Sequence, residues 1–301
     1  MTVRVGLVGP GEWGRLILRD LKALGAEVWT DARSPASVEN ARRFGADHIV
    51  QGLEELPADL DGYVVATPAE THLDVVEPLL RRGRPIFVEK PLDVDVARAR
   101  ALPPGAQSLV FTMHKWRYHA GVDRLAAIAR SGDLGPLRGL DLVRVGFGQM
   151  SARNVGGIWS LVPHDLSIAL HILGEAPRPV WASPGALDRP GDGIVAVLET
   201  RAGVRVSLNA SMFTPVKRRS VVLAGELGAA QLDDSLADHL LIAWEDGRTE
   251  RIEVPVTMPL LIELERFVDH LRGGPPPMTR LSEELQVLEA LEQLHHMAGL
   301  A

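Results

Sequence analysis

The sequence predicts an α/β protein of two domains. Residues 1–117 are expected to form an N-terminal Rossmann domain, a doubly wound parallel sheet, and residues 118–301 a C-terminal α+β domain with a large, mostly antiparallel sheet. Three observations predict this division: a glycine-rich turn between the first strand and the first helix, strands that alternate with helices in the first part, and many strands with few helices in the second. A length of 301 residues also fits about two domains.

Composition limits the classes of function. The chain is 46% apolar and 24% charged, as is usual for a globular protein. A net charge of −7 argues against a nucleic-acid partner, which needs clustered Lys and Arg. Residues 1–3 lead directly into a strand and no apolar run could span a bilayer, so we expect a cytoplasmic protein without a membrane partner. The absence of cysteine excludes disulfides, thiolate nucleophiles and cysteine-based zinc sites.

The first strand and the turn after it predict a dinucleotide site. Residues 3–8 are rich in valine, and apolar residues then recur at helical spacing as far as Gly25. Gly9 would permit a tight turn, Gly11 a close approach of the main chain to a pyrophosphate, and Gly14 close packing of helix on strand. The predicted cofactor loop also contains Glu12 and Trp13, and the amides at the helix start would face the phosphates. The alternative is an ordinary strand-to-helix turn.

Asp31 bears on the choice of cofactor. It ends a second predicted strand, residues 26–30, about 20 residues beyond the glycines, where a carboxylate can bind both ribose hydroxyls. A carboxylate there repels a 2′-phosphate, so NAD is favoured over NADP. Arg33, two residues further on, could bind such a phosphate or lie over the adenine, which leaves NADP possible. The alternative for Asp31 is a helix cap.

The remaining elements follow from periodicity and turn signals. In the first domain we expect helices at 37–44 and 71–82, a short apolar piece at 48–50, and strands at 62–66, 85–88 and 108–113. In the second we expect a helix at 120–131, a strand at 137–148, and further strands around Val180, Val195, Val204, Val221, Ala230, Leu241 and Ile252. Two amphipathic helices, separated at 273–277, close the chain and are expected to pack back on the first domain.

Five segments together resemble one known family. Residues 9–14 resemble its cofactor loop, Thr67-Pro68 with His72 its T-P-x-x-x-H segment, and Glu89-Lys90-Pro91 its E-K-P signature. Residues 156–167 resemble its G-G-x-x-x-D-x-x-x-H segment, and 259–290 its closing helices. The chain thus resembles the Gfo/Idh/MocA oxidoreductases, which act mainly on sugars and cyclitols with a nicotinamide cofactor. Within them it is most similar to members of nucleotide-sugar or antibiotic-sugar pathways.

This resemblance implies hydride transfer between NAD and a secondary alcohol or ketone of a sugar, nucleotide sugar or cyclitol. Such a reaction needs a base or an acid at the reacting oxygen, and Lys90 and His164 are the candidate catalytic residues. Lys90 follows an apolar strand at the carboxyl edge of the sheet, where ligands bind in such folds. The alternative for Lys90 is a lysine that extends into solvent at a strand end. The alternative for His164 is a helix cap or a buried structural histidine.

Other side chains are predicted to support the site. Besides the glycine loop, Asp31, Arg33 and Lys90, cofactor contacts are expected from Thr67, Pro68, His72 and Glu89. Substrate contacts are expected from Lys90, His114, Arg117, Arg153, Ser160, His164 and Asp165, with Lys115 beside them. The alternatives are strand-end turns, a helix cap at His72 and a solvated loop around His114. His295-His296 lacks an acidic or histidine partner at helical spacing, and no metal site is expected.

Ser160 departs from the family pattern. The family usually has aspartate four residues before the catalytic histidine, where helical spacing lets the carboxylate orient the imidazole and stabilise its protonated form. Serine carries no charge, which leaves two alternatives: an NAD-binding regulatory protein without turnover, and a non-redox sugar enzyme that uses bound NAD transiently. The resemblance also implies a homodimer or homotetramer assembled through the open face of the second sheet.

Overall fold

The computed structural model describes residues 2–147, 156–234 and 236–300. The chain divides into two compact units: unit 1 contains Met1–Lys115 and Met258–Leu285, and unit 2 contains Trp116–Thr257 and Gln286–Ala301. The sequence led us to expect a boundary after residue 117 and closing helices that pack back on the first domain. In the structure the first segment of unit 1 ends at Lys115, and the chain returns to this unit at Met258 and leaves it again within its last helix.

Unit 1 contains a six-stranded sheet with the order β3-β2-β1-β4-β5-β6, in which every pair of strands is parallel. The strands are β1 (Arg4–Val8), β2 (Glu27–Asp31), β3 (His48–Val50), β4 (Gly62–Val65), β5 (Ile86–Glu89) and β6 (Val110–Met113). This confirms the predicted doubly wound sheet. The strand order reverses between β1 and β4, and ligands of such sheets bind beyond the carboxyl ends of the strands at this point.

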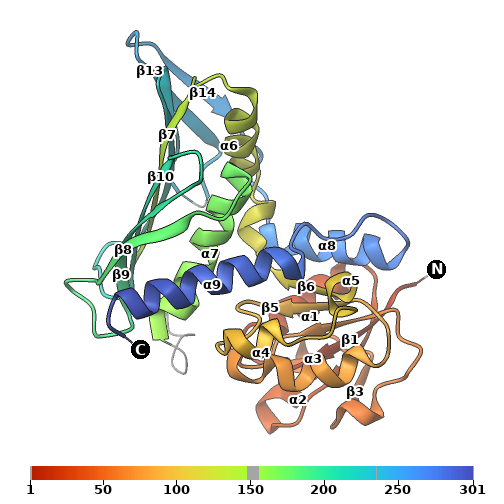
Figure 1. Ribbon diagram of the computed structural model, residues 1–301. Coiled ribbons are helices and arrows are strands. Elements are labelled where there is room, and N and C mark those ends of the chain that lie inside the picture. Colours follow the sequence, from red (N-terminus) through yellow and green to blue (C-terminus); the bar gives the residue numbers. More distant parts are fainter. Residues whose placement is uncertain (1, 148–155, 235, 301) are drawn as a thin grey trace. The chain divides into compact units, whose positions relative to one another are not determined.

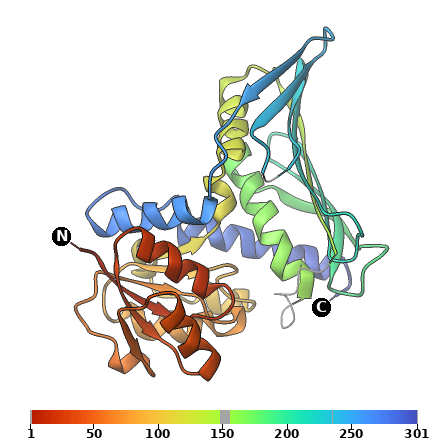
Figure 2. The same cartoon turned by 180° about the vertical axis from the view of Figure 1, so that it is seen from behind.

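Helices flank this sheet and complete its core. They are α1 (Gly14–Ala23), α2 (Pro35–Arg43), α3 (His72–Leu80), α4 (Val96–Arg100), α5 (Ala106–Leu109) and α8 (Pro259–Leu271). The strand expected from residue 108 begins at Val110, because α5 occupies the preceding residues. Helix α8 packs on α1 (Figure 2), and its Leu264 and Phe267 join Ile17 in one buried cluster. The Phe267 ring stacks on Phe87 with ring centroids 4.9 Å apart, so a distant segment of sequence completes the core of unit 1.

Unit 2 is built on an eight-stranded sheet with the order β14-β13-β12-β11-β7-β10-β9-β8, antiparallel except for the parallel pair β7 and β10. The strands are β7 (Leu137–Val145), β8 (Arg178–Pro184), β9 (Gly193–Glu199), β10 (Arg205–Ser211), β11 (Arg218–Gly225), β12 (Gly228–Leu232), β13 (His239–Trp244) and β14 (Thr249–Glu253). Helices α6 (Ala120–Ser131) and α7 (Gly156–Leu173) lie against one face (Figure 1). The mostly antiparallel sheet is therefore confirmed.

The two faces of this second sheet differ in polarity. Along β10, Val206 and Leu208 are buried under the helices, whereas Arg205, Ser207 and Asn209 are exposed. The last helix, α9 (Leu281–Met297), begins in unit 1 and contributes Leu291 and Leu294 to the core of unit 2. Within the ranges described, no helix has the length and apolar character needed to cross a membrane.

Candidate active site

The turn between β1 and α1 has the steric properties of a dinucleotide loop. Gly9 has a φ of 87°, and a Cβ there would lie 2.9 Å from the Ala66 carbonyl oxygen. A Cβ on Gly14 would lie 2.1 Å from the Gly9 carbonyl oxygen, so both positions require glycine. At Gly11 a Cβ would meet no described atom within 4 Å, so the main chain is open on that side. No described side chain caps α1, and the Arg15 and Leu16 amides donate to the Gly11 and Trp13 carbonyl oxygens, so the turn fits a pyrophosphate that approaches the open side of Gly11.

Asp31 and Arg33 form an ion pair at the end of β2. Asp31 is 2% exposed, and Arg33 Nη2 donates to its Oδ2 at 2.9 Å while Arg33 Nε lies 3.3 Å from both carboxylate oxygens. The hydrogen bonds to Asp31 raise the pKa of Arg33, whose side chain is 63% exposed. Asp31 is thus at the edge where ribose hydroxyls would bind, and Arg33, the candidate phosphate ligand, is held beside it.

The glycine turn, the E-K-P segment and the end of β6 are connected through side chains. Trp13 Nε1 donates to Glu89 Oε1, and the Lys115 ammonium lies 4.1 Å from the centroid of the Trp13 ring. The second Glu89 oxygen accepts from the Lys90 amide at 3.1 Å. Burial raises the pKa of Glu89, and Lys90, Lys115 and the Trp13 hydrogen bond oppose this effect. These contacts place Trp13, Glu89 and Lys90 together at the carboxyl edge of the sheet.

His72 links two turns of this edge. Its Nδ1 lies 2.8 Å from the Pro91 carbonyl oxygen and its Nε2 lies 2.9 Å from the Thr67 carbonyl oxygen. The ring is 1% exposed, and burial lowers its pKa. Both ring nitrogens therefore face backbone carbonyls, and the geometry makes His72 a positioning residue for the turns that carry Thr67, Pro68 and Lys90. Thr67 is half-buried and Pro68 exposed.

His114 and Arg117 are more buried than a solvated loop would allow. His114 is 2% exposed, and its Nε2 pairs with Glu284 Oε2 at 2.5 Å, while Glu284 Oε1 accepts from the Leu92 amide at 3.0 Å. These hydrogen bonds connect β6 and the segment after Lys90 to the start of α9. Arg117 is 6% exposed at the beginning of unit 2. A contact of either residue with substrate stays a prediction.

In unit 2, the other candidates lie on α7. Ser160 and His164 are both half-buried and four residues apart on this helix, as the predicted helical spacing requires. The His164 ring meets Trp116 edge-on, with ring centroids 6.4 Å apart. Asp165 is 2% exposed, and its Oδ1 accepts from Arg144 Nε at 2.8 Å. Burial raises the pKa of Asp165, and Arg144 opposes this effect. Arg153, the other substrate contact predicted near this helix, lies outside the described residues.

The profile of the GFO/IDH/MocA oxidoreductase family, described by its NAD-binding Rossmann fold, matches residues 3–108, and the C-terminal domain of the same family matches residues 122–231. The chain belongs to this family. The predicted family, the Rossmann fold and the NAD-type cofactor are thereby confirmed.

Similar proteins carry names of sugar and cyclitol enzymes. The chain is 29% identical to inositol 2-dehydrogenase of Rhizobium meliloti over 83% of its length and 81% of that protein. It is 28% identical to UDP-N-acetylglucosamine 3-dehydrogenase of Acidithiobacillus ferrooxidans over 91% and 90%. A solved structure of the latter enzyme has a TM-score of 0.86 at 24% identity, covering 99% of this chain and 98% of that one. Levoglucosan dehydrogenase with NADH has a TM-score of 0.87 at 16% identity, covering 99% and 97%, and supports the fold.

Sequence reasoning did not identify four polar residues of this family member. Arg144 and Arg219 meet only through the register of β7 with β11, which no local pattern specifies. Glu284 lies in the first turn of α9, where acids are common. Glu263 stands within an apolar stretch of α8, and that interruption was the available signal. Among the described residues, no group of three side chains could hold a metal ion.

Proposed function

We propose that this GFO/IDH/MocA protein oxidises a secondary alcohol, or reduces the corresponding ketone, on a sugar, nucleotide sugar or cyclitol, with NAD(H) as the cofactor. The observation that carries the proposal is the connected edge of unit 1, where Trp13 of the glycine turn contacts Glu89 beside Lys90. The inositol and UDP-N-acetylglucosamine dehydrogenases to which the chain is similar support this class of substrate.

The residues of unit 1 fit a nicotinamide dinucleotide. Gly9, Gly11 and Gly14 would hold the pyrophosphate, and Asp31 would accept hydrogen bonds from the ribose hydroxyls. When bound, the cofactor supplies the site that accepts or gives a hydride. Glu89 fixes the Trp13 indole and the Lys90 amide, and therefore orients the segment that presents the Lys90 side chain.

Proton transfer is assigned to Lys90 and His164. Oxidation of a carbinol needs a group that binds the hydroxyl and takes its proton, and the reverse reaction needs an acid at the same oxygen. Lys90 follows β5 at the carboxyl edge, and His164 is held on α7 against Trp116. We assign Lys90 to binding of the hydroxyl and His164 to the proton, and treat Ser160 as a neutral neighbour on the same helix.

The decisive experiment measures NADH formation by the purified protein from NAD and a panel that includes myo-inositol and UDP-N-acetylglucosamine. Lys90→Ala and His164→Ala should each lower kcat by roughly 10²–10⁴-fold, with NADH affinity changed much less. Lys22→Ala is the control, because Lys22 pairs with Asp47 on the surface. Full activity in either variant would remove that residue from the mechanism.

A second candidate function comes from Ser160, which lacks the charge that would stabilise a protonated His164. A regulatory protein of this family would bind NADH and produce none from any substrate. An enzyme that uses NAD transiently would consume substrate without net NADH. Measuring substrate loss and NADH in the same sample separates these two alternatives from the dehydrogenase.

We further propose that the exposed face of the unit 2 sheet forms a homodimer or homotetramer interface. Apolar Trp181 and Val195 lie on the adjacent strands β8 and β9 and are 51% and 38% exposed, and exposed apolar patches often mark interfaces. Light scattering should give a multiple of the chain mass, and Trp181→Asp should reduce it. A monomer at all concentrations would contradict the proposal. A cytoplasmic location, without nucleic-acid or membrane partners, stays a prediction.

A further inference from the structure

Two arginines face each other across neighbouring strands of unit 2. Arg144 on β7 is directly opposite Arg219 on β11 in the antiparallel register. Both guanidinium groups lie over the Trp116 ring, at 5.2 Å and 5.8 Å from its centroid. Like charges in directly opposite positions repel, so this pair requires negative charge nearby. Stacking on an indole supplies only part of the compensation.

Asp165 forms an ion pair with one of the two arginines. Its Oδ1 accepts from Arg144 Nε at 2.8 Å, and both side chains are almost fully buried. Arg219 has no carboxylate within ion-pair distance among the described residues, and its buried Nε has no acceptor there. The second Asp165 oxygen, Oδ2, is likewise buried without a donor among them. Burial and the neighbouring Arg144 lower the pKa of Arg219, and the charges of Asp165 and Asp234 oppose this effect.

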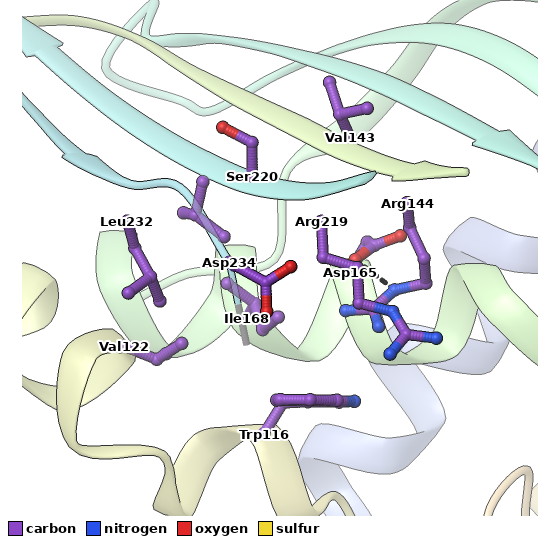
Figure 3. A pocket seen from close by; sticks show the side chains of 11 residues that line it. Trp116, Val122, Val143, Arg144, Asp165, Ile168, Arg219, Ser220, Leu232 and Asp234 are labelled. Atoms are coloured by element: carbon purple, nitrogen blue, oxygen red, sulfur yellow. Dashed lines mark hydrogen bonds and ion pairs between the residues drawn. The ribbon is translucent and has the colours of Figure 1, made fainter. Parts of the chain in front are cut away.

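The arginines line a pocket, shown in Figure 3. Arg144 and Arg219 point toward Trp116 on one side, and Val122, Ile168 and Leu232 form an apolar side. Asp234 also lines the pocket, and its charge favours the protonated form of Arg219 without forming an ion pair with it. An anion is therefore expected at the arginine side, where Arg219 can present its donors as a planar fork.

This pocket lies next to the residue assigned to proton transfer. Trp116 contacts both arginines and also meets the His164 ring edge-on, and Asp165 is the next residue along α7 after His164. We propose that Arg219, with Arg144 held by Asp165, binds the carboxylate or phosphate group of an anionic substrate. The inference rests on the proposed dehydrogenase function and narrows it: acidic or phosphorylated sugars are preferred to neutral polyols.

The test measures binding of three probes to the NADH-loaded protein by calorimetry: D-glucuronate, D-glucose 1-phosphate and D-glucose. At least one of the two anions should bind more tightly than glucose. Arg219→Gln should weaken the binding of that anion by about tenfold or more, because the substitution removes a charge-assisted hydrogen bond. Glucose should be affected much less. The control is Arg218→Gln, which removes the same charge from the exposed neighbour on β11 and should leave binding unchanged. Arg219→Lys keeps the charge without the fork and should give an intermediate loss.

The outcomes separate this inference from the proposed function. If the binding of glucuronate depends on Arg219, the recognised group is a carboxylate. If the binding of glucose 1-phosphate depends on Arg219, it is a phosphate. Anion binding that depends on Arg219, without NADH formation from any substrate, would keep the site and remove the dehydrogenase. No anion binding by the unmodified protein, or equal binding by Arg219→Gln and Arg218→Gln, would overturn the inference even if neutral sugars are oxidised.

Discussion

At the end of β2, the Asp31 carboxylate is expected to affect cofactor choice in two ways. Asp31 is buried and holds the exposed guanidinium of Arg33, at the position where the ribose of a dinucleotide would lie. The carboxylate would repel a 2′-phosphate directly, and it keeps the donors of Arg33 directed toward itself. The expected preference for NADH over NADPH therefore depends on both residues.

We predict that NADH binds more tightly than NADPH by roughly tenfold or more, which corresponds to about 1.4 kcal/mol. Asp31→Ser should reduce this preference by about the same factor, because it removes the repulsion and releases Arg33 for the phosphate. Arg33→Ala is the matched comparison and should maintain or increase the preference. Fluorescence titrations with both cofactors measure the ratio. An unchanged ratio in Asp31→Ser would show that Asp31 does not face the ribose.

Ser160 affects the chemistry through its position on α7, one turn before His164. In Ser160→Asp, an opposite charge would favour the protonated imidazole, so the base would keep its proton to higher pH. We predict that the rise of kcat/KM for alcohol oxidation shifts toward higher pH in this variant. Ser160→Asn, similar in size and neutral, should leave the profile in place. Superimposable profiles for all three proteins would mean that His164 is not the titrating group or does not face position 160.

At the scale of elements, the β1–α1 turn contains one glycine that folding requires and one that cofactor binding is expected to require. A Cβ at Gly14 would overlap the Gly9 carbonyl oxygen, whereas a Cβ at Gly11 would enter open space. Gly14→Ala should therefore destabilise the protein by about 1–3 kcal/mol, the usual cost of overpacking. Gly11→Ala should change the unfolding midpoint little and weaken NADH binding by about tenfold or more, because the methyl group occupies the approach to the pyrophosphate.

Two measurements on both variants check these expectations. Thermal unfolding of the cofactor-free protein gives the stability, and a titration with NADH gives the affinity. The two glycines serve as controls for each other, since they lie three residues apart in one turn. Wild-type NADH affinity in Gly11→Ala would contradict a close approach of the main chain to the phosphates. Wild-type stability in Gly14→Ala would contradict the close packing of α1 on the turn.

The sequence predicted the helices and strands, which carry a local signal, and did not predict side-chain contacts that depend on distant pairing. Gly9, Gly11 and Gly14 identified the first turn because the steric demand is local, and helix α6 has its predicted bounds, Ala120–Ser131. The strand before His114 is shorter than expected, because α5 ends only at Leu109. The opposition of Arg144 and Arg219 follows from strand register, which depends on the whole sheet and not on the residues near either arginine.

At the scale of the whole molecule, the path of the chain explains a buried acid. Residues 258–285 return to unit 1, where α8 packs against α1 and places Glu263 within the core. Glu263 is 0% exposed, and neither carboxyl oxygen makes a hydrogen bond of normal geometry with a described residue. Burial, reinforced by Glu89, raises the pKa of Glu263 well above its usual range, and Lys115 and the His114 backbone amide oppose this only in part. The folded protein therefore keeps this carboxyl protonated at pH values where the unfolded chain has lost the proton.

This difference predicts how stability depends on pH. Because the folded state binds the extra proton, the contribution of Glu263 to stability is complete below the ordinary pKa of glutamate and declines as pH rises toward the elevated folded value. Glu263→Gln cannot ionise, so its free energy of unfolding relative to the unmodified protein should increase with pH. We expect a small difference at about pH 5 and a gain of about 1–3 kcal/mol at about pH 8, because each unit by which folding raises the pKa of the carboxyl costs about 1.4 kcal/mol once it must ionise. Urea unfolding at both pH values measures the difference in the free energy of unfolding. The control is Glu265→Gln, which changes an exposed glutamate on α8 and should show no dependence of this difference on pH. If Glu263→Gln instead lost more stability at about pH 8 than at about pH 5, Glu263 would be an ionised partner of Lys115, and the core of unit 1 would contain a salt bridge in place of a neutral acid.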